Sequence, residues 1–115
     1  MTSDESCLFC RIVRREIPAT IVHEDETVLA FRDVAPKAPT HILVIPKAHL
    51  SKISEAKAGD AALLGKVLHT LSVIAAKEGL TDYRVVANNG AGAGQSVFHV
   101  HFHLMAGRAF AWPPG

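Results

Sequence analysis

Three histidines alternate with apolar residues near the C-terminal end of the sequence, in the stretch 98–104. Successive side chains of a β-strand point to opposite faces, so His99, His101 and His103 are expected on one face of a predicted strand. The apolar residues between them would then face the core. Solvated histidines on a surface strand are the alternative, but three in register directly after a glycine-rich segment favour a functional site.

The chemistry that such a row of imidazoles could perform is nucleophilic attack on phosphorus. A neutral imidazole is a nucleophile near pH 7 and can form a covalent intermediate. The spacing favours His101, because it is central and has a histidine on each side to orient it. A three-histidine metal centre is the competing interpretation. Neighbouring positions on one face lie roughly 6.6 Å apart, so their side chains diverge more readily than they converge on one ion.

The segment before the histidines supplies groups that could bind an anion. Gly90, Gly92 and Gly94 allow positive φ angles, which can aim successive backbone N–H groups at one point. Gln95 and Ser96 add side-chain donors. Such turns are common between strands, but this one leads straight into the histidines, and phosphoryl transfer needs donors for the equatorial oxygens beside an in-line nucleophile.

Cys7 and Cys10 form a C-x-x-C pair near the start of the chain. A redox motif would follow a strand, and nothing folded is expected before Cys7. A zinc site needs two more ligands, for which His49 and His99 are the candidates, and this would be a closed structural site. Two buried free thiols are the alternative.

Bulk composition narrows the class of protein. The 115 residues are 49% hydrophobic and 20% charged, with a formal net charge of +1, as expected of one globular domain with a single core. No basic stripe supports nucleic-acid binding, and no apolar run approaches the ~20 residues of a membrane span. The acidic start does not resemble a secretory signal, so a cytoplasmic protein with reduced thiols is expected.

The elements that must position these groups follow from periodicity and from turn residues. A short helix is predicted after Cys7, ending before Pro18. A long helix is predicted over about 60–78, with its apolar face formed by Leu64, Val67, Leu68, Leu71, Ile74 and Ala75 and its end at Gly79. The predicted strands are 20–24, 28–33, 41–46, 83–88 and 98–104. This order predicts an α+β domain, with an antiparallel β-sheet, one long helix and a short N-terminal helix.

The histidine stretch also resembles a known family. The run from His99 to Met105 matches the histidine-triad (HIT) motif, in which three histidines alternate with apolar residues. Segments 15–19, 38–47, 94–97 and 112–115 are similar to the Hint branch of that family. The resemblance covers nearly the whole chain and implies a single HIT domain over residues 1–115.

The resemblance implies hydrolysis of purine nucleoside 5′-phosphoramidates through a nucleotidyl-histidine intermediate. By matching position, His101 would attack the α-phosphorus, and His103 and His41 would assist by hydrogen bonding and proton management. Ser96 would hold phosphate oxygens, together with the backbone at Gly94 and Gln95, and would serve the leaving amine.

The resemblance further implies a nucleotide pocket. Asp33 would accept hydrogen bonds from the ribose hydroxyls, Asn88 would lie near the phosphate and ribose, and an apolar slot would hold the purine. The implied nucleotide-binding residues are Phe9, Ile12, Phe31, Asp33, Val34, Asn88, Gly94, Gln95, Ser96, His101 and His103. Ordinary core packing is the alternative for the apolar members of this set, above all for Ile12.

Relatives of this type are homodimers, in which the tail at Trp112 would lean toward the partner's pocket. Some bacterial members bind a structural zinc, a pattern that Cys7, Cys10, His49 and His99 match. Two alternatives to the phosphoramidase stay open at this point. One is a dinucleoside polyphosphate hydrolase, and the other is a nucleotide-binding regulatory protein whose hydrolytic activity is incidental.

Overall fold

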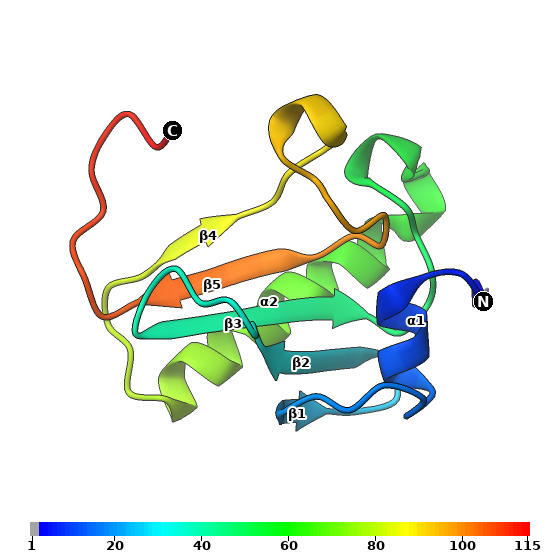
Figure 1. The fold of residues 1–115 in the computed structure, drawn as a ribbon, viewed down its shortest axis with the longest axis horizontal. Helices are drawn as coiled ribbons and strands as arrows, with labels where there is room; N and C mark the ends of the chain where they lie inside the picture. The colour runs from blue at the N-terminus through cyan, green and yellow to red at the C-terminus, as the bar shows by residue number, and fades with distance from the viewer. Residues whose placement is uncertain (1–2) are drawn as a thin grey trace.

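A five-stranded antiparallel sheet organises the chain, which we describe over residues 3–115 in a computed structural model (Figure 1). The spatial order of its strands is β1-β2-β3-β5-β4. The strands are β1 (Ile21–Glu24), β2 (Val28–Arg32), β3 (Thr40–Pro46), β4 (Arg84–Val86) and β5 (Phe102–Ala106). The helices are α1 (Leu8–Val13) and α2 (Ala61–Lys77), with short 3-10 turns at Ile53–Glu55, Ala58–Asp60 and Ala91–Ala93. The predicted α+β class is confirmed.

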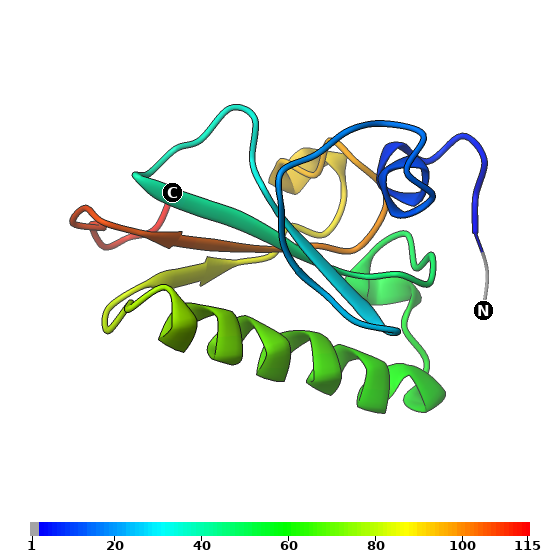
Figure 2. The same cartoon turned by 90° about the horizontal axis from the view of Figure 1, so that it is seen from below.

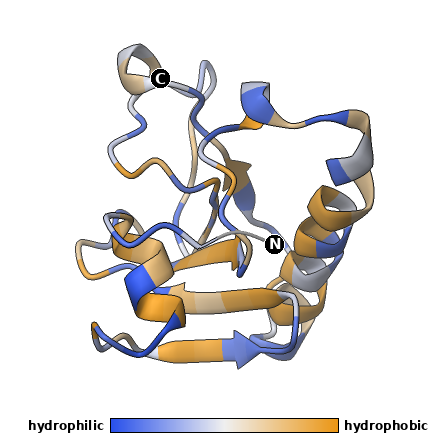
Figure 3. Cartoon of the chain, turned by 90° about the vertical axis from the view of Figure 1, so that its right-hand side faces the viewer, coloured by the Kyte–Doolittle hydropathy of each residue, from blue (hydrophilic) through white to orange (hydrophobic). Residues whose placement is uncertain are grey.

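The two faces of the sheet carry different layers (Figure 2). Helix α2 runs along one face, where Val67, Leu71 and Ile74 pack against apolar residues of β2, β3 and β5. Helix α1 and the glycine-rich segment lie on the opposite face, where a second apolar cluster joins α1 to the strands. Hydrophobic residues accordingly run along the central strands, whereas α2 alternates between hydrophobic and hydrophilic positions (Figure 3).

Helix α2 follows its predicted bounds within one residue at each end, and Gly79 ends it with φ +74°. Leu68 departs from the predicted apolar face, because its side chain is 45% exposed. The segment Ala58–Lys77 also meets the length and composition of a membrane span, contrary to the expectation that no run approaches one. One face of this helix nevertheless packs on the sheet, as the core helix of a globular domain does.

The strand that carries the histidines begins later than predicted. Strand β5 starts at Phe102, so His99 and His101 precede the ladder and only His103 lies within it. The main-chain N–H of Val100 donates instead to the carbonyl of Leu50, 2.6 Å away. Because His99 and His101 lie outside the strand, their side chains need not share one face of the sheet. His99 belongs to the Cys–His cluster, and His101 lines a cleft.

Gly107 lets the chain turn sharply after β5. Its φ is +96°, and a Cβ atom placed there would lie 2.8 Å from the Cβ of Pro39. Gly65 in the middle of α2 has open space around it and an ordinary helical φ. The two glycines therefore make a matched pair for testing the turn.

Gly107→Ala should lower the free energy of unfolding by about 2 kcal/mol, since alanine meets both an unfavourable φ and a steric clash. Gly65→Ala should instead raise it by roughly 0.5–1 kcal/mol, because alanine is the better helix former. Urea denaturation followed by circular dichroism measures both. Equal effects of the two substitutions would contradict this account of the turn.

Candidate active site and metal-binding cluster

His101 is held by a hydrogen bond to the main chain. Its Nδ1 lies 2.7 Å from the carbonyl oxygen of His99. A carbonyl can only accept, so Nδ1 carries the proton and donates, which leaves the lone pair of the neutral ring on Nε2. The ring of Phe9 packs edge-on against the imidazole, with centroids 5.1 Å apart. His101 is therefore fixed in the tautomer whose Nε2 can act as a nucleophile.

A second chain of hydrogen bonds orders His103 and His41. The main-chain N–H of Lys37 donates to Nδ1 of His41 at 3.0 Å, so the neutral His41 ring carries its proton on Nε2. That Nε2 lies 2.8 Å from Nδ1 of His103 and 3.5 Å from a carboxylate oxygen of Asp33. His103 thus accepts at Nδ1 and keeps its own proton on Nε2.

Both members of this pair are held neutral at physiological pH. Burial, together with the nearby His101 and His41, lowers the pKa of His103 to about 4, although the charge of Asp33 opposes the shift. Burial also lowers the pKa of His41, and the charge of Asp33 opposes that shift. The two neutral rings therefore form a chain of hydrogen bonds that runs from the main-chain N–H of Lys37 through His41 to His103, whose Nε2–H is left as a donor.

His101 and His103 face a cleft of about 330 Å³. Phe9, Ile12 and Phe31, from α1 and β2, form an apolar wall of the cleft. Asp33, Ser96 and the almost fully exposed Val34 also line it. An apolar wall, a carboxylate and an imidazole in one cleft suit the base, the ribose and the phosphate of a nucleotide.

The glycine-rich segment bonds mainly to itself, and this departs from the expected anion nest. The N–H groups of Gly94 and Gln95 donate to the carbonyls of Ala91 and Gly90. The buried Gln95 amide accepts from the N–H of Gly90 and donates to the carbonyls of Ser51 and Val97. These hydrogen bonds fix the conformation of the segment that precedes Ser96. Within residues 3–115, the main-chain N–H groups of Ser96 and Val97 have no backbone acceptor.

Cys7, Cys10, His49 and His99 come together in a separate cluster beside the cleft. Nδ1 of His99 lies 3.3 Å from Sγ of Cys7 and 3.5 Å from Sγ of Cys10, and Nδ1 of His49 lies 3.4 Å from Sγ of Cys10. All four ligand atoms lie within 4.8 Å of one another. Sulfur and nitrogen on one tetrahedral zinc are separated by about 3.5 Å. The donor set and its spacing therefore fit such an ion.

Outer contacts orient the two histidines of this cluster. Nε2 of the fully buried His99 donates to the carbonyl of Pro46 at 2.7 Å, which leaves Nδ1 as the ligand atom. Nε2 of His49 lies 3.9 Å from a carboxylate oxygen of Asp4. Burial lowers the pKa of His99 to about 4, so the ring is neutral, as metal ligation requires.

The structure brings most of the predicted site residues together, but not all of them. Asn88, Gly94 and Gln95 do not line the cleft; Asn88 lies beside Gly94, behind the segment that supports Ser96. The cleft is also lined by residues outside the predicted set, namely Leu8, Ile17, Pro18, Ala19, Arg32, Leu43 and Val97. Segment 15–19 resembles the Hint branch in sequence, and its position after α1 is the signal that could place Ile17, Pro18 and Ala19 in this wall.

Comparison with known proteins shows which family this chain resembles. The HIT domain matches residues 14–110. An uncharacterised HIT-like protein of Synechococcus elongatus is 58% identical over 112 residues, which cover 96% of this chain and 98% of that protein. A 14 kDa zinc-binding protein of Zea mays is 50% identical (97% and 90% covered), and adenylylsulfatase HINT1 of Arabidopsis thaliana is 46% identical (98% and 79% covered).

Solved structures show the same fold. The crystal structure of a HIT family hydrolase from Legionella pneumophila superposes with a TM-score of 0.93 at 49% identity, covering 96% of this chain and 100% of that one. The predicted HIT-like fold and the Hint resemblance are thereby confirmed. Because the HIT domain matches residues 14–110, which are most of the chain, the chain belongs to the histidine-triad (HIT) family.

Proposed function

We propose that this chain hydrolyses purine nucleoside 5′-phosphoramidates, with His101 as the nucleophile. The observation that carries the proposal is the fixed tautomer of His101, which presents a bare Nε2 to a cleft with an apolar wall. The purine would lie against the wall that the contacting rings of Phe9 and Phe31 form, and the carboxylate of Asp33 would accept hydrogen bonds from the ribose hydroxyls.

In the first step Nε2 of His101 attacks the α-phosphorus, and the bond from phosphorus to the amine nitrogen breaks. The electron pair of that bond stays on nitrogen, which takes a proton at the Ser96 hydroxyl, and Ser96 regains its proton from solvent. The phosphorylated ring becomes cationic, and its Nδ1–H keeps its bond to the His99 carbonyl, which stabilises the charge.

In the second step water attacks the phosphorus of the nucleotidyl-histidine. The electron pair of the bond to Nε2 returns to the ring, and the proton released by water balances the one taken up in the first step. The Nε2–H of His103, together with Ser96 and the free amides of Ser96 and Val97, would hold the phosphate oxygens through both steps.

A second candidate is hydrolysis of a bond between the nucleotide phosphorus and an oxygen, as in a dinucleoside polyphosphate or adenylyl sulfate. The name of the Arabidopsis relative favours the sulfate substrate. Rates on an adenosine phosphoramidate, adenylyl sulfate and a dinucleoside polyphosphate, measured side by side, would rank the three. A regulatory protein would bind nucleotide without turning any of them over.

The Cys–His cluster would hold a structural zinc that joins α1 to the loop between β3 and the 3-10 turn at Ile53–Glu55 and to the segment before β5. The name of the Zea mays relative supports this assignment, as does the fit of the four ligand atoms. When bound, the ion would supply cross-linking and no chemistry to the cleft, because its four protein ligands would close the coordination shell. The free, buried thiols accord with a cytoplasmic location, which is part of the proposal.

We further propose that two copies pair through the sheet edge at β4. This edge strand has three residues, its Val85 and the preceding Tyr83 are exposed, and Leu68 of α2 is exposed as well. Covering the edge with the same strand of a second copy would satisfy its main-chain groups.

His101→Ala should lower kcat on adenosine 5′-phosphoramidate by more than about a thousandfold, because no other group can form the intermediate. Affinity for adenosine monophosphate should stay within about tenfold, ~1.4 kcal/mol. His69→Ala, at an exposed position of α2, is the control and should behave as the unaltered protein does. Near-normal turnover by the His101 variant would refute the assignment of the nucleophile.

The purified chain should contain close to one zinc ion per chain by elemental analysis, and Cys10→Ser should contain far less. At free zinc of 100–1,000 times the dissociation constant, the ion should add about 3–4 kcal/mol to the free energy of unfolding. Turnover should survive chelation wherever the fold persists. A chain whose denaturation curve is the same with zinc and with chelator would contradict the structural role.

The neutral state of His103 predicts how stability depends on pH. Its folded pKa of about 4 lies below the ordinary value of 6.5. Between pH 6.5 and pH 4, His103 therefore binds a proton in the unfolded chain but not in the folded chain. The free energy of unfolding should therefore fall as pH is lowered from about 6.5 to about 4. The curve of His103→Asn should be flatter in that interval, and that of His69→Asn unchanged; parallel curves for all three proteins would count against a buried, neutral His103.

A further inference from the structure

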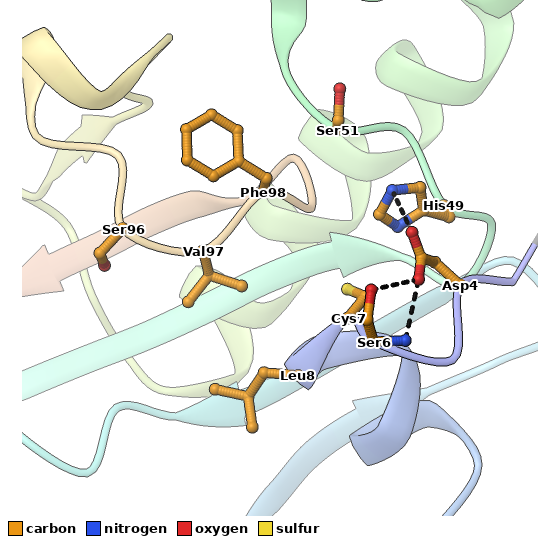
Figure 4. A pocket seen from close by; sticks show the side chains of 9 residues that line it. All are labelled: Asp4, Ser6, Cys7, Leu8, His49, Ser51, Ser96, Val97 and Phe98. Carbon is orange, nitrogen blue, oxygen red and sulfur yellow. Dashed lines mark hydrogen bonds and ion pairs between the residues drawn. The ribbon is translucent and has the colours of Figure 1, made fainter.

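A second pocket, of about 420 Å³, opens beside the nucleotide cleft (Figure 4). Leu8, Ser96 and Val97 line both spaces, so the two are neighbours across the ridge that these side chains form. In Figure 4, Val97 and Phe98 stand on one side of the second pocket, and Asp4 and Ser6 stand on the other. Cys7 and His49 of the metal-binding cluster also line this pocket, and the nucleotide proposed above does not occupy it.

The position of the second pocket relates it to the group that leaves the phosphorus. Phe9 and Phe31 give the nucleotide cleft its aromatic wall, and Ser96 and His101 line the same cleft. Attacking and leaving atoms lie roughly in line in phosphoryl transfer. A substituent on phosphorus that leaves the cleft past Ser96 and Val97 enters the second pocket.

The lining of the second pocket has an apolar wall and a carboxylate. Leu8 is 44% exposed and Phe98 is 42% exposed, so both offer uncovered hydrophobic surface to an arm lying between them. Asp4 closes the far side, where one of its oxygens accepts from the N–H and the hydroxyl of Ser6. No lysine or arginine among the described residues 3–115 lines this pocket.

We propose that this pocket is the leaving-group subsite of the enzyme, and that it selects amines with an extended apolar arm ending in a neutral or cationic group. An arm along Leu8 and Phe98 would bury apolar surface, and an ammonium at its end would lie beside the Asp4 carboxylate. An anionic end would meet that carboxylate, which lies 3.9 Å from Nε2 of His49 and has no lysine or arginine of the pocket lining beside it. The inference rests on the phosphoramidase function proposed above.

Four adenosine phosphoramidates test the subsite. One releases ammonia, and the others release straight-chain amines of equal length that end in a methyl group, an ammonium group or a carboxylate. We expect kcat/KM to rank ammonium above methyl and methyl above carboxylate, with about two- to fivefold between neighbours, as for partly exposed charge pairs. Added salt should narrow the gap between the charged substrates. Equal rates for the three long amines would overturn the proposal.

Two variants assign the effect to this pocket. Phe98→Ala should lower the ratio of kcat/KM for the methyl-ended amine over the ammonia-releasing substrate by about fivefold, since the arm loses its apolar wall. Asp4→Asn should reduce the preference for ammonium over carboxylate to near unity. Glu26→Gln removes an exposed carboxylate at the β1–β2 turn, outside the lining of the pocket, and should leave that preference intact.

The two proposals fail in different ways. A chain that does not release ammonia from the smallest substrate lacks the proposed function, and the subsite falls with it. A chain that turns over the smallest substrate, but whose ratios do not respond to Phe98→Ala and Asp4→Asn, is a phosphoramidase without this subsite. Loss of all ratios in the Glu26 control would likewise refute the assignment to this pocket.

Discussion

The site depends on His99, whose main chain holds His101 and whose side chain belongs to the Cys–His cluster. The carbonyl of His99 accepts a hydrogen bond from Nδ1–H of His101 and so fixes the tautomer of that ring, while the ring of His99 is buried between the Pro46 carbonyl and the two thiols. A buried imidazole with both nitrogens engaged cannot turn without losing those bonds, which costs free energy in a low-dielectric interior. The main chain at His99 is therefore rigid, and the orientation of His101 inherits that rigidity.

The strands and the buried face of α2 could be predicted from the sequence, because the spacing of the apolar residues determines which side chains face the core. The alternating histidines also signalled the site, but a strict strand period would put all three rings on one face. His99 and His101 leave the ladder instead, since the cluster at Cys7 and the Leu50 carbonyl engage this stretch before β5 begins. Cys7 and Leu50 lie far from the histidines in the sequence, so the local sequence pattern does not predict these contacts.

The glycine-rich segment shows a different limit of sequence reasoning. Glycines permit several turns, and composition does not say which N–H groups the turn itself will consume. Here the side chain of Gln95 bridges the two ends of the turn and the Ser51 carbonyl, and the N–H groups of Gly94 and Gln95 are used internally. The donors left over are those after the turn, at Ser96 and Val97, which a count of glycines would not single out.

Helix α1 links the Cys–His cluster to the cleft that His101 and His103 face. It has six residues, far fewer than the ~12–15 that an isolated helix needs to be even marginally stable, so its position depends on what it contacts. Cys7 and Cys10 flank Phe9, whose ring touches Phe31 and His101. An ion that joined the two cysteines to His49 and His99 would therefore fix the position of Phe9, and with it one wall of the cleft. None of its four ligands lines the cleft, so the ion would act on that wall only through the position of α1.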